Sequence, residues 1–155
     1  MKRVLFFSLV LMLAFTGSVY AQSGPDFSGT WVLDTAKSDL GMNNPAAKQM
    51  PMHKVSLILR QTASQLTIER STGDTAVYNL DGSESINSLP SGSQATTLMK
   101  WAGDTLVAKT TSNIGGQSVE MTDVRSLDAS GQVMTVHVTR QTPRSEVKQT
   151  LIYNK

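Results

Sequence analysis

Short segments in which apolar and polar residues alternate fill most of this chain after residue 55. Such alternation is typical of half-buried β-strands, because successive side chains of a strand point to opposite faces. Turn-forming residues such as Gly73, Gly103 and Gly131 separate several of the segments. We expect nine strands, at residues 27–33, 55–60, 66–70, 76–80, 96–101, 106–111, 118–127, 133–140 and 146–153.

Most of the expected strands are joined by connections of hairpin length, which favour antiparallel neighbours. Closing such a meander into a barrel removes its unpaired edges, whereas a β-sandwich needs longer crossing connections. We therefore predict an all-β fold, an antiparallel up-and-down β-barrel of nine to ten strands, with a β-sandwich as the alternative. The Gly- and Ser-rich segment 81–93 is read as a long loop that could contain a short edge strand. One short helix is expected at 44–49, with Asn44 as its N-cap and Pro45 at the first helical position.

Residues 1–21 have the three parts of a secretory signal peptide. Lys2 and Arg3 precede an apolar run at 4–15, and Val19 and Ala21 fit a cleavage signal. A membrane anchor is the alternative, but a bilayer crossing takes about 20 predominantly apolar residues, more than this run provides. We expect cleavage after Ala21, a single barrel domain at 22–155 without a transmembrane segment, and a periplasmic or secreted location.

Charge and cysteine content narrow the classes of function. The chain has 14 basic and 12 acidic residues, and loss of Lys2 and Arg3 with the leader leaves 12 of each. A nearly neutral chain without a run of like charges argues against nucleic-acid binding, which needs clustered lysine and arginine. The absence of cysteine excludes disulfides, thiolate metal sites and thiol catalysis.

Catalytic and metal-binding patterns do not stand out in the sequence. His53 and His137 are the only histidines, and neither has an acidic residue or another histidine at ligand spacing. A Gly-x-Ser-x-Gly motif, a phosphate-binding glycine loop and a paired carboxylate motif are also absent. We therefore expect a non-enzymatic protein with no metal and no cofactor.

Several short motifs resemble one protein superfamily. Phe27, Gly29 and Trp31 form a Phe-x-Gly-x-Trp opening that resembles that of the calycins, which include the lipocalins and the fatty-acid-binding proteins. Segments 104–107, 124–127 and 151–155 resemble the fatty-acid-binding branch and follow in the expected order. The resemblance implies an up-and-down barrel that encloses a fatty acid, a retinoid or a similar amphiphile.

The anion site of the fatty-acid-binding branch typically uses two arginines and a tyrosine. By position, Arg125 matches one arginine and Tyr153 matches the tyrosine, whereas Leu151 stands in place of the second arginine. Either another residue substitutes for that arginine or the ligand has no carboxylate, because a guanidinium is what makes burial of a carboxylate favourable. A structural role remains the alternative for Arg125 and Tyr153.

Two further interpretations follow from the opening motif. Gly29 and Trp31 are expected to be structural: Gly29 leaves room for a close neighbour, and Trp31 plugs a barrel end with a basic side chain over its ring. The candidates for that basic side chain are Arg125, Arg140 and Lys148. One barrel family with a Gly-x-Trp-x-Gly opening binds haem through a single histidine. His137 is therefore a further candidate ligand-binding residue, although Leu33 replaces the second glycine of that motif.

Together these features predict an exported, monomeric binding protein that holds a small hydrophobic or amphiphilic molecule inside its barrel. The alternative is a filled barrel that acts through its outer surface, as an envelope protein-interaction or inhibitor module. Large inward side chains that leave no cavity would favour the alternative.

Overall fold

One antiparallel sheet of ten strands makes up the described part of the protein. The computed structural model describes residues 24–41 and 55–155. Along the sheet the strands follow the order β4-β3-β2-β1-β10-β9-β8-β7-β6-β5, so that β1 pairs with both β2 and β10. The strands are β1 (Gly29–Leu33), β2 (Ser56–Gln61), β3 (Gln65–Arg70), β4 (Thr75–Asn79), β5 (Asp81–Ser88), β6 (Gln94–Ala102), β7 (Thr105–Ile114), β8 (Gln117–Leu127), β9 (Val133–Thr142) and β10 (Ser145–Asn154).

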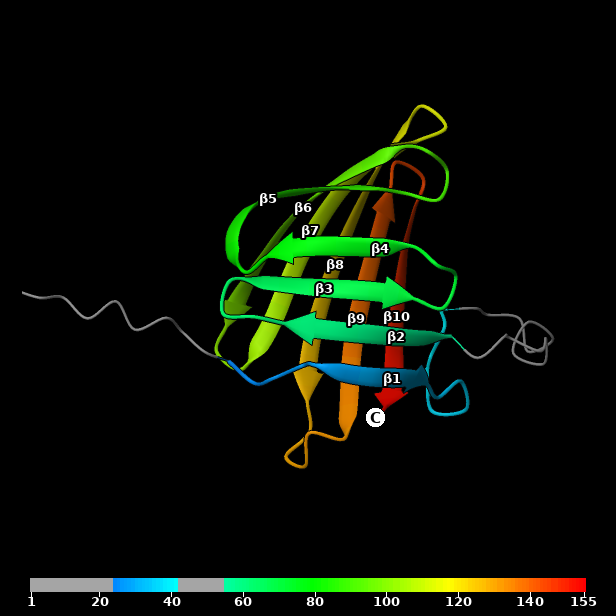
Figure 1. Ribbon diagram of the computed structural model, residues 1–155. Coiled ribbons are helices and arrows are strands. Elements are labelled where there is room, and N and C mark those ends of the chain that lie inside the picture. The colour runs from blue at the N-terminus through cyan, green and yellow to red at the C-terminus, as the bar shows by residue number, and fades with distance from the viewer. Residues whose placement is uncertain (1–23, 42–54) are drawn as a thin grey trace, which may run out of the picture.

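The sheet curls into a nearly closed barrel. In Figure 1, β1–β4 cross in front of β6–β10, and the chain passes from β4 into β5 at one side of the molecule. All ten strands belong to one sheet and neighbours in it are antiparallel, which confirms the up-and-down barrel and makes the β-sandwich alternative wrong.

The strands β4 and β5 are the two ends of the sheet, and they meet at a seam that side chains bridge. The side-chain amide of Asn87 accepts a hydrogen bond from Val77 N at 2.9 Å and donates one to Val77 O at 3.0 Å. Ser85 Oγ accepts another from Asn79 N at 2.8 Å. The amide of Asn87 thus takes the place of the paired backbone hydrogen bonds of an adjacent strand.

The predicted loop 81–93 contains a full strand. β5 occupies eight residues of it, at one end of the sheet, where the sequence indicated at most a short edge strand. Its one large apolar residue, Ile86, is 62% exposed. The strand therefore lacks the alternation that marks the other strands.

One end of the barrel is filled by large apolar side chains. Phe27 and Trp31 are fully buried, and Trp31 Nε1 donates a hydrogen bond to the Phe27 carbonyl oxygen at 2.8 Å. The ring of Trp101 lies 6.0 Å from that of Phe27, centroid to centroid. Further buried apolar residues belong to the same core cluster: Leu66, Leu80, Leu106 and Met134.

The basic side chain over the Trp31 ring is Lys155, so the expectation of Arg125, Arg140 or Lys148 in this place is wrong. Lys155 Nζ lies 5.3 Å from the centroid of the Trp31 ring, a cation–π contact worth about 0.5–2 kcal/mol. Gly29 has a φ of +139°, and a Cβ there would lie 2.4 Å from Lys155 Cε. Gly29 therefore allows both the backbone conformation and the close approach of Lys155.

The short helix predicted at 44–49 lies outside the described residues. Residues 24–41 and 55–155 contain strands and turns but no helix. Accordingly, no helix in these ranges has the length and hydropathy needed to cross a membrane.

Candidate ligand-binding cavity

Small inward side chains leave a cavity of about 240 Å³ in the half of the barrel away from Trp31. Further along two of the strands that supply them, inward positions of the same parity carry larger side chains, such as Trp101 of β6 and Leu106 of β7. The cavity therefore follows from residue size on the inner face, because a barrel of this kind is otherwise filled by its own side chains. The small residues that line it are Ala76 of β4, Ala95 and Thr97 of β6, and Ala108 and Thr110 of β7.

A second cavity, of about 200 Å³, adjoins the first. Leu57, Ile68, Val136, Val138 and Leu151 give it an apolar wall. Each cavity alone is smaller than the range of about 300–1,000 Å³ that is typical of small-molecule sites. The residues that line both are Arg70, Met121, Asp123 and Arg125.

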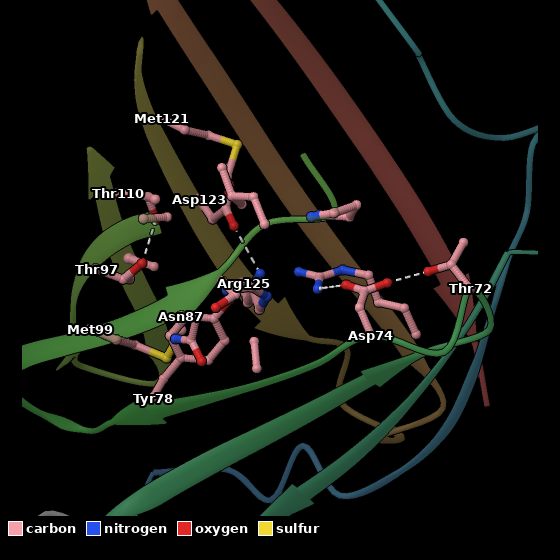
Figure 2. Close-up of a pocket in the computed structure, with 17 residues that line it drawn as sticks. Thr72, Asp74, Tyr78, Asn87, Thr97, Met99, Thr110, Met121, Asp123 and Arg125 are labelled. Carbon is pink, nitrogen blue, oxygen red and sulfur yellow. Dashed lines mark hydrogen bonds and ion pairs between the residues drawn. The ribbon is translucent and has the colours of Figure 1, made fainter. Parts of the chain in front are cut away.

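An ion pair lies where the two cavities meet. Asp123 and Arg125 are two residues apart on β8, so both side chains point inward. Arg125 Nη2 lies 2.8 Å from Asp123 Oδ2, and each side chain is only 11% exposed (Figure 2). The pairing offsets the large cost of removing either charge from water.

Each member of this pair keeps one polar atom without a partner. Among the described residues, neither Asp123 Oδ1 nor Arg125 Nη1 has a hydrogen-bond partner, and both atoms are shielded from solvent. An unsatisfied buried polar atom costs about 1–3 kcal/mol. The pair thus has one free acceptor and one free donor.

A second arginine–aspartate pair contributes to the first cavity. Arg70, the last residue of β3, pairs through Nη1 with Oδ2 of Asp74, and Asp74 also accepts a hydrogen bond from the Thr72 hydroxyl (Figure 2). The Thr72 hydroxyl, and then Arg70, hold the pKa of Asp74 below its usual value. Burial works against the charge of Arg70, but Tyr78 and Asp74 outweigh it, so that the pKa of Arg70 lies above its usual value.

Tyr153 stands beside both arginines and one of the aspartates. It is 6% exposed and lines the second cavity. Burial raises the pKa of Tyr153 above its usual value, Asp123 adds to the rise, and Arg125 and Arg70 partly offset it. Its hydroxyl therefore stays protonated at neutral pH and can both donate and accept a hydrogen bond.

Three of the four residues singled out as ligand-binding candidates come together in the structure. Arg125 lines both cavities, and Tyr153 and Leu151 line the second. His137 does not join them: it is exposed on the outer face of β9, where its Nδ1 lies 3.2 Å from Thr150 Oγ1. A ligand held inside the barrel would not contact His137.

The match by position to the family motif does not include Arg70 and Asp123. Both were detectable from strand alternation, because Arg70 has the same parity as the apolar Leu66 and Ile68, and Asp123 has the same parity as Arg125. Within residues 24–41 and 55–155, no group of three or more histidine, aspartate or glutamate side chains has a geometry suited to a metal ion.

Neither a family model nor a curated protein sequence matches this chain. Several solved structures do resemble it. A zebrafish ileal bile acid-binding protein complexed with cholic acid is 12% identical, with a TM-score of 0.57 over 83% of this chain and 98% of that one. A fatty acid-binding protein of Schistosoma mansoni in complex with arachidonic acid is 14% identical, with a TM-score of 0.54 over 90% and 98%.

A fatty acid-binding protein from brain tissue of Drosophila melanogaster is 18% identical, with a TM-score of 0.55 over 84% of this chain and 100% of that one. At such identities the likeness concerns the fold. The chain therefore has the same type of antiparallel β-barrel fold as these bile acid- and fatty acid-binding proteins.

Proposed function

We propose that this protein binds a small hydrophobic or amphiphilic molecule inside its barrel, without catalysing a reaction on it. The observation that carries the proposal is a pair of adjoining cavities with largely apolar walls and one polar cluster at their junction. Ligand sites commonly combine an apolar wall with a few well-placed polar groups. The bound molecules named for two structural neighbours, cholic acid and arachidonic acid, belong to the same chemical class.

Apolar burial would supply most of the affinity in such a site. Removing apolar surface from water contributes about 25 cal/mol per Å². Leu151 and its apolar neighbours would contact the hydrophobic part of the ligand, while Arg125 and Tyr153 would orient its polar group.

The cavity favours internal binding over the alternative of a filled barrel that acts through its outer surface. A filled barrel needs large side chains on the inner face, whereas Ala95, Thr97 and Ala108 occupy such positions here. In a solid core these positions would need larger side chains to reach the usual packing density.

Export to the periplasm or the medium belongs to the same proposal. Its support is the signal-peptide pattern at 1–21, with cleavage after Ala21. The mass of the chain recovered from the organism that makes it would then correspond to a start at Gln22.

A cavity-filling substitution tests internal binding. Ala108→Phe places a large ring in the first cavity, and we expect it to abolish the fluorescence gain of Nile red, a neutral hydrophobic dye, while the circular dichroism spectrum keeps its strand signature. Thr111→Phe adds the same ring to an exposed position of the same strand and should leave dye binding unchanged. Equal dye binding by the unmodified protein and a folded Ala108→Phe variant would contradict the proposal.

A further inference from the structure

The charged side chains that line the two cavities have equal numbers of positive and negative charges. Four of the described residues that line either cavity are charged, and they form two ion pairs: Arg70 with Asp74, and Arg125 with Asp123. A ligand that enters these cavities therefore meets no uncompensated positive charge from residues 24–41 and 55–155. Figure 2 labels Asp123 and Arg125 of the one pair and Asp74 of the other among the side chains that line the first cavity.

This arrangement of charges disfavours the binding of a carboxylate ligand. To reach Arg125 it would have to lie beside Asp123, which is itself buried, and two like charges repel strongly away from water. Displacing Asp123 from Arg125 would instead leave a buried carboxylate without its partner, which is strongly unfavourable. An ammonium group would meet the corresponding opposition from Arg125 and Arg70.

An uncharged polar group avoids both penalties. It can also use the hydrogen-bonding capacity that the Asp123–Arg125 pair leaves unsatisfied in the described part of the chain. Asp123 Oδ1 is an acceptor that has no donor among the described residues, and Arg125 Nη1 is a donor that has no acceptor there. A hydroxyl or a primary amide can donate to the first and accept from the second once the two side chains turn toward the cavity, because both atoms are shielded from solvent in this structure. The neutral phenol of Tyr153 adds another group of the same kind at this place.

We propose that the ligand carries an uncharged polar group that both donates and accepts hydrogen bonds, such as an alcohol or a primary amide, and that Asp123 excludes carboxylates from the cavity. This inference rests on the proposed binding function. It makes Asp123 a residue that determines specificity, in addition to Arg125.

A series of ligands with one alkyl chain and different polar groups tests the inference. Dodecanol, dodecanamide, dodecanoate and dodecylamine are compared at neutral pH by displacement of Nile red from the unmodified protein. We expect the alcohol and the amide to bind at least about tenfold more tightly than either charged compound, in line with the cost of leaving a buried charge unpaired.

The substitution Asp123→Asn removes the negative charge and keeps the size of the side chain. It should raise the affinity for dodecanoate by about tenfold or more, because Arg125 is then free to pair with the ligand. Glu120→Gln makes the same change at an exposed position of β8, three residues away, and should leave all four affinities unchanged.

The outcomes separate the two proposals. Failure of the protein to bind Nile red or any of the four compounds would overturn the binding function itself. Tightest binding of dodecanoate by the unmodified protein would overturn only the inference about the polar group, and so would unchanged dodecanoate affinity in a folded Asp123→Asn variant. If Asp123→Asn does not fold, the comparison on the unmodified protein decides.

Discussion

Tyr153 combines near-complete burial with a position beside both ion pairs of the cavity. Its pKa is raised, chiefly by burial. The folded protein therefore keeps the phenolic proton to a higher pH than the unfolded chain, in which a tyrosine titrates at about pH 10. The stabilisation linked to this proton is complete below about pH 10 and is lost as the pH rises through the pKa of the folded state.

Replacing this tyrosine should remove that pH dependence. We expect the free energy of unfolding of the unmodified protein to fall more between roughly pH 8 and pH 11 than that of Tyr153→Phe. Urea unfolding at a series of pH values measures both curves, and the lysines that titrate in the same range contribute equally to each. Parallel curves for the two proteins would contradict the burial of a neutral Tyr153.

At the scale of single residues, the sequence predicted two members of the polar cluster that lines the cavities. Strand alternation was consistent with an inward position of two others, Arg70 and Asp123. Arg125 and Tyr153 were identified because they occupy positions of a known motif. Arg70 was not, because that motif places its second arginine at position 151 on β10, whereas Arg70 comes from β3. Which pairs form across a barrel depends on strand register and shear, and alternation along one strand does not specify either.

At the scale of elements, the seam between β4 and β5 is the place where the sheet lacks a backbone ladder within its described residues. Asn87 joins the two strands through both the N–H and the C=O of Val77. Each such hydrogen bond contributes about 0.5–1.5 kcal/mol net, and the backbone groups of Val77 lose these partners if the side chain is removed.

Asn87→Ala should lower the free energy of unfolding by about 1–3 kcal/mol and speed hydrogen exchange at the Val77 amide. Asn113→Ala, at an exposed position near the end of β7, is the matched control and should change neither. Native-like protection of the Val77 amide in Asn87→Ala would show that the side chain does not hold the seam.

The same strand β5 shows where pattern-based prediction fails. The other strands of the sheet carry enough alternating apolar residues to be predicted as strands, but β5 has Ser, Gly and Asn at most positions. Because β5 lies at the end of the sheet and pairs by backbone hydrogen bonds with β6 alone, its side chains need not be apolar. Its conformation is set by its neighbours and not by its own composition.

At the scale of the whole molecule, the barrel divides into a filled half and a hollow half. Large side chains around Phe27 and Trp31 form the core, and small ones such as Ala95 and Ala108 leave the first cavity. The nearly closed barrel was predictable from turn spacing and alternation. The division was not, because it depends on which inward positions of different strands share a level of the barrel.

The central claim is that the hollow half holds a small molecule, and native mass spectrometry of the protein purified from the organism that makes it tests this most directly. The account predicts a chain that begins at Gln22 and carries an uncharged amphiphile, which is released on denaturation and absent from Ala108→Phe prepared in the same way. Protein that is consistently free of any bound molecule, and that also fails to bind Nile red, would contradict the account.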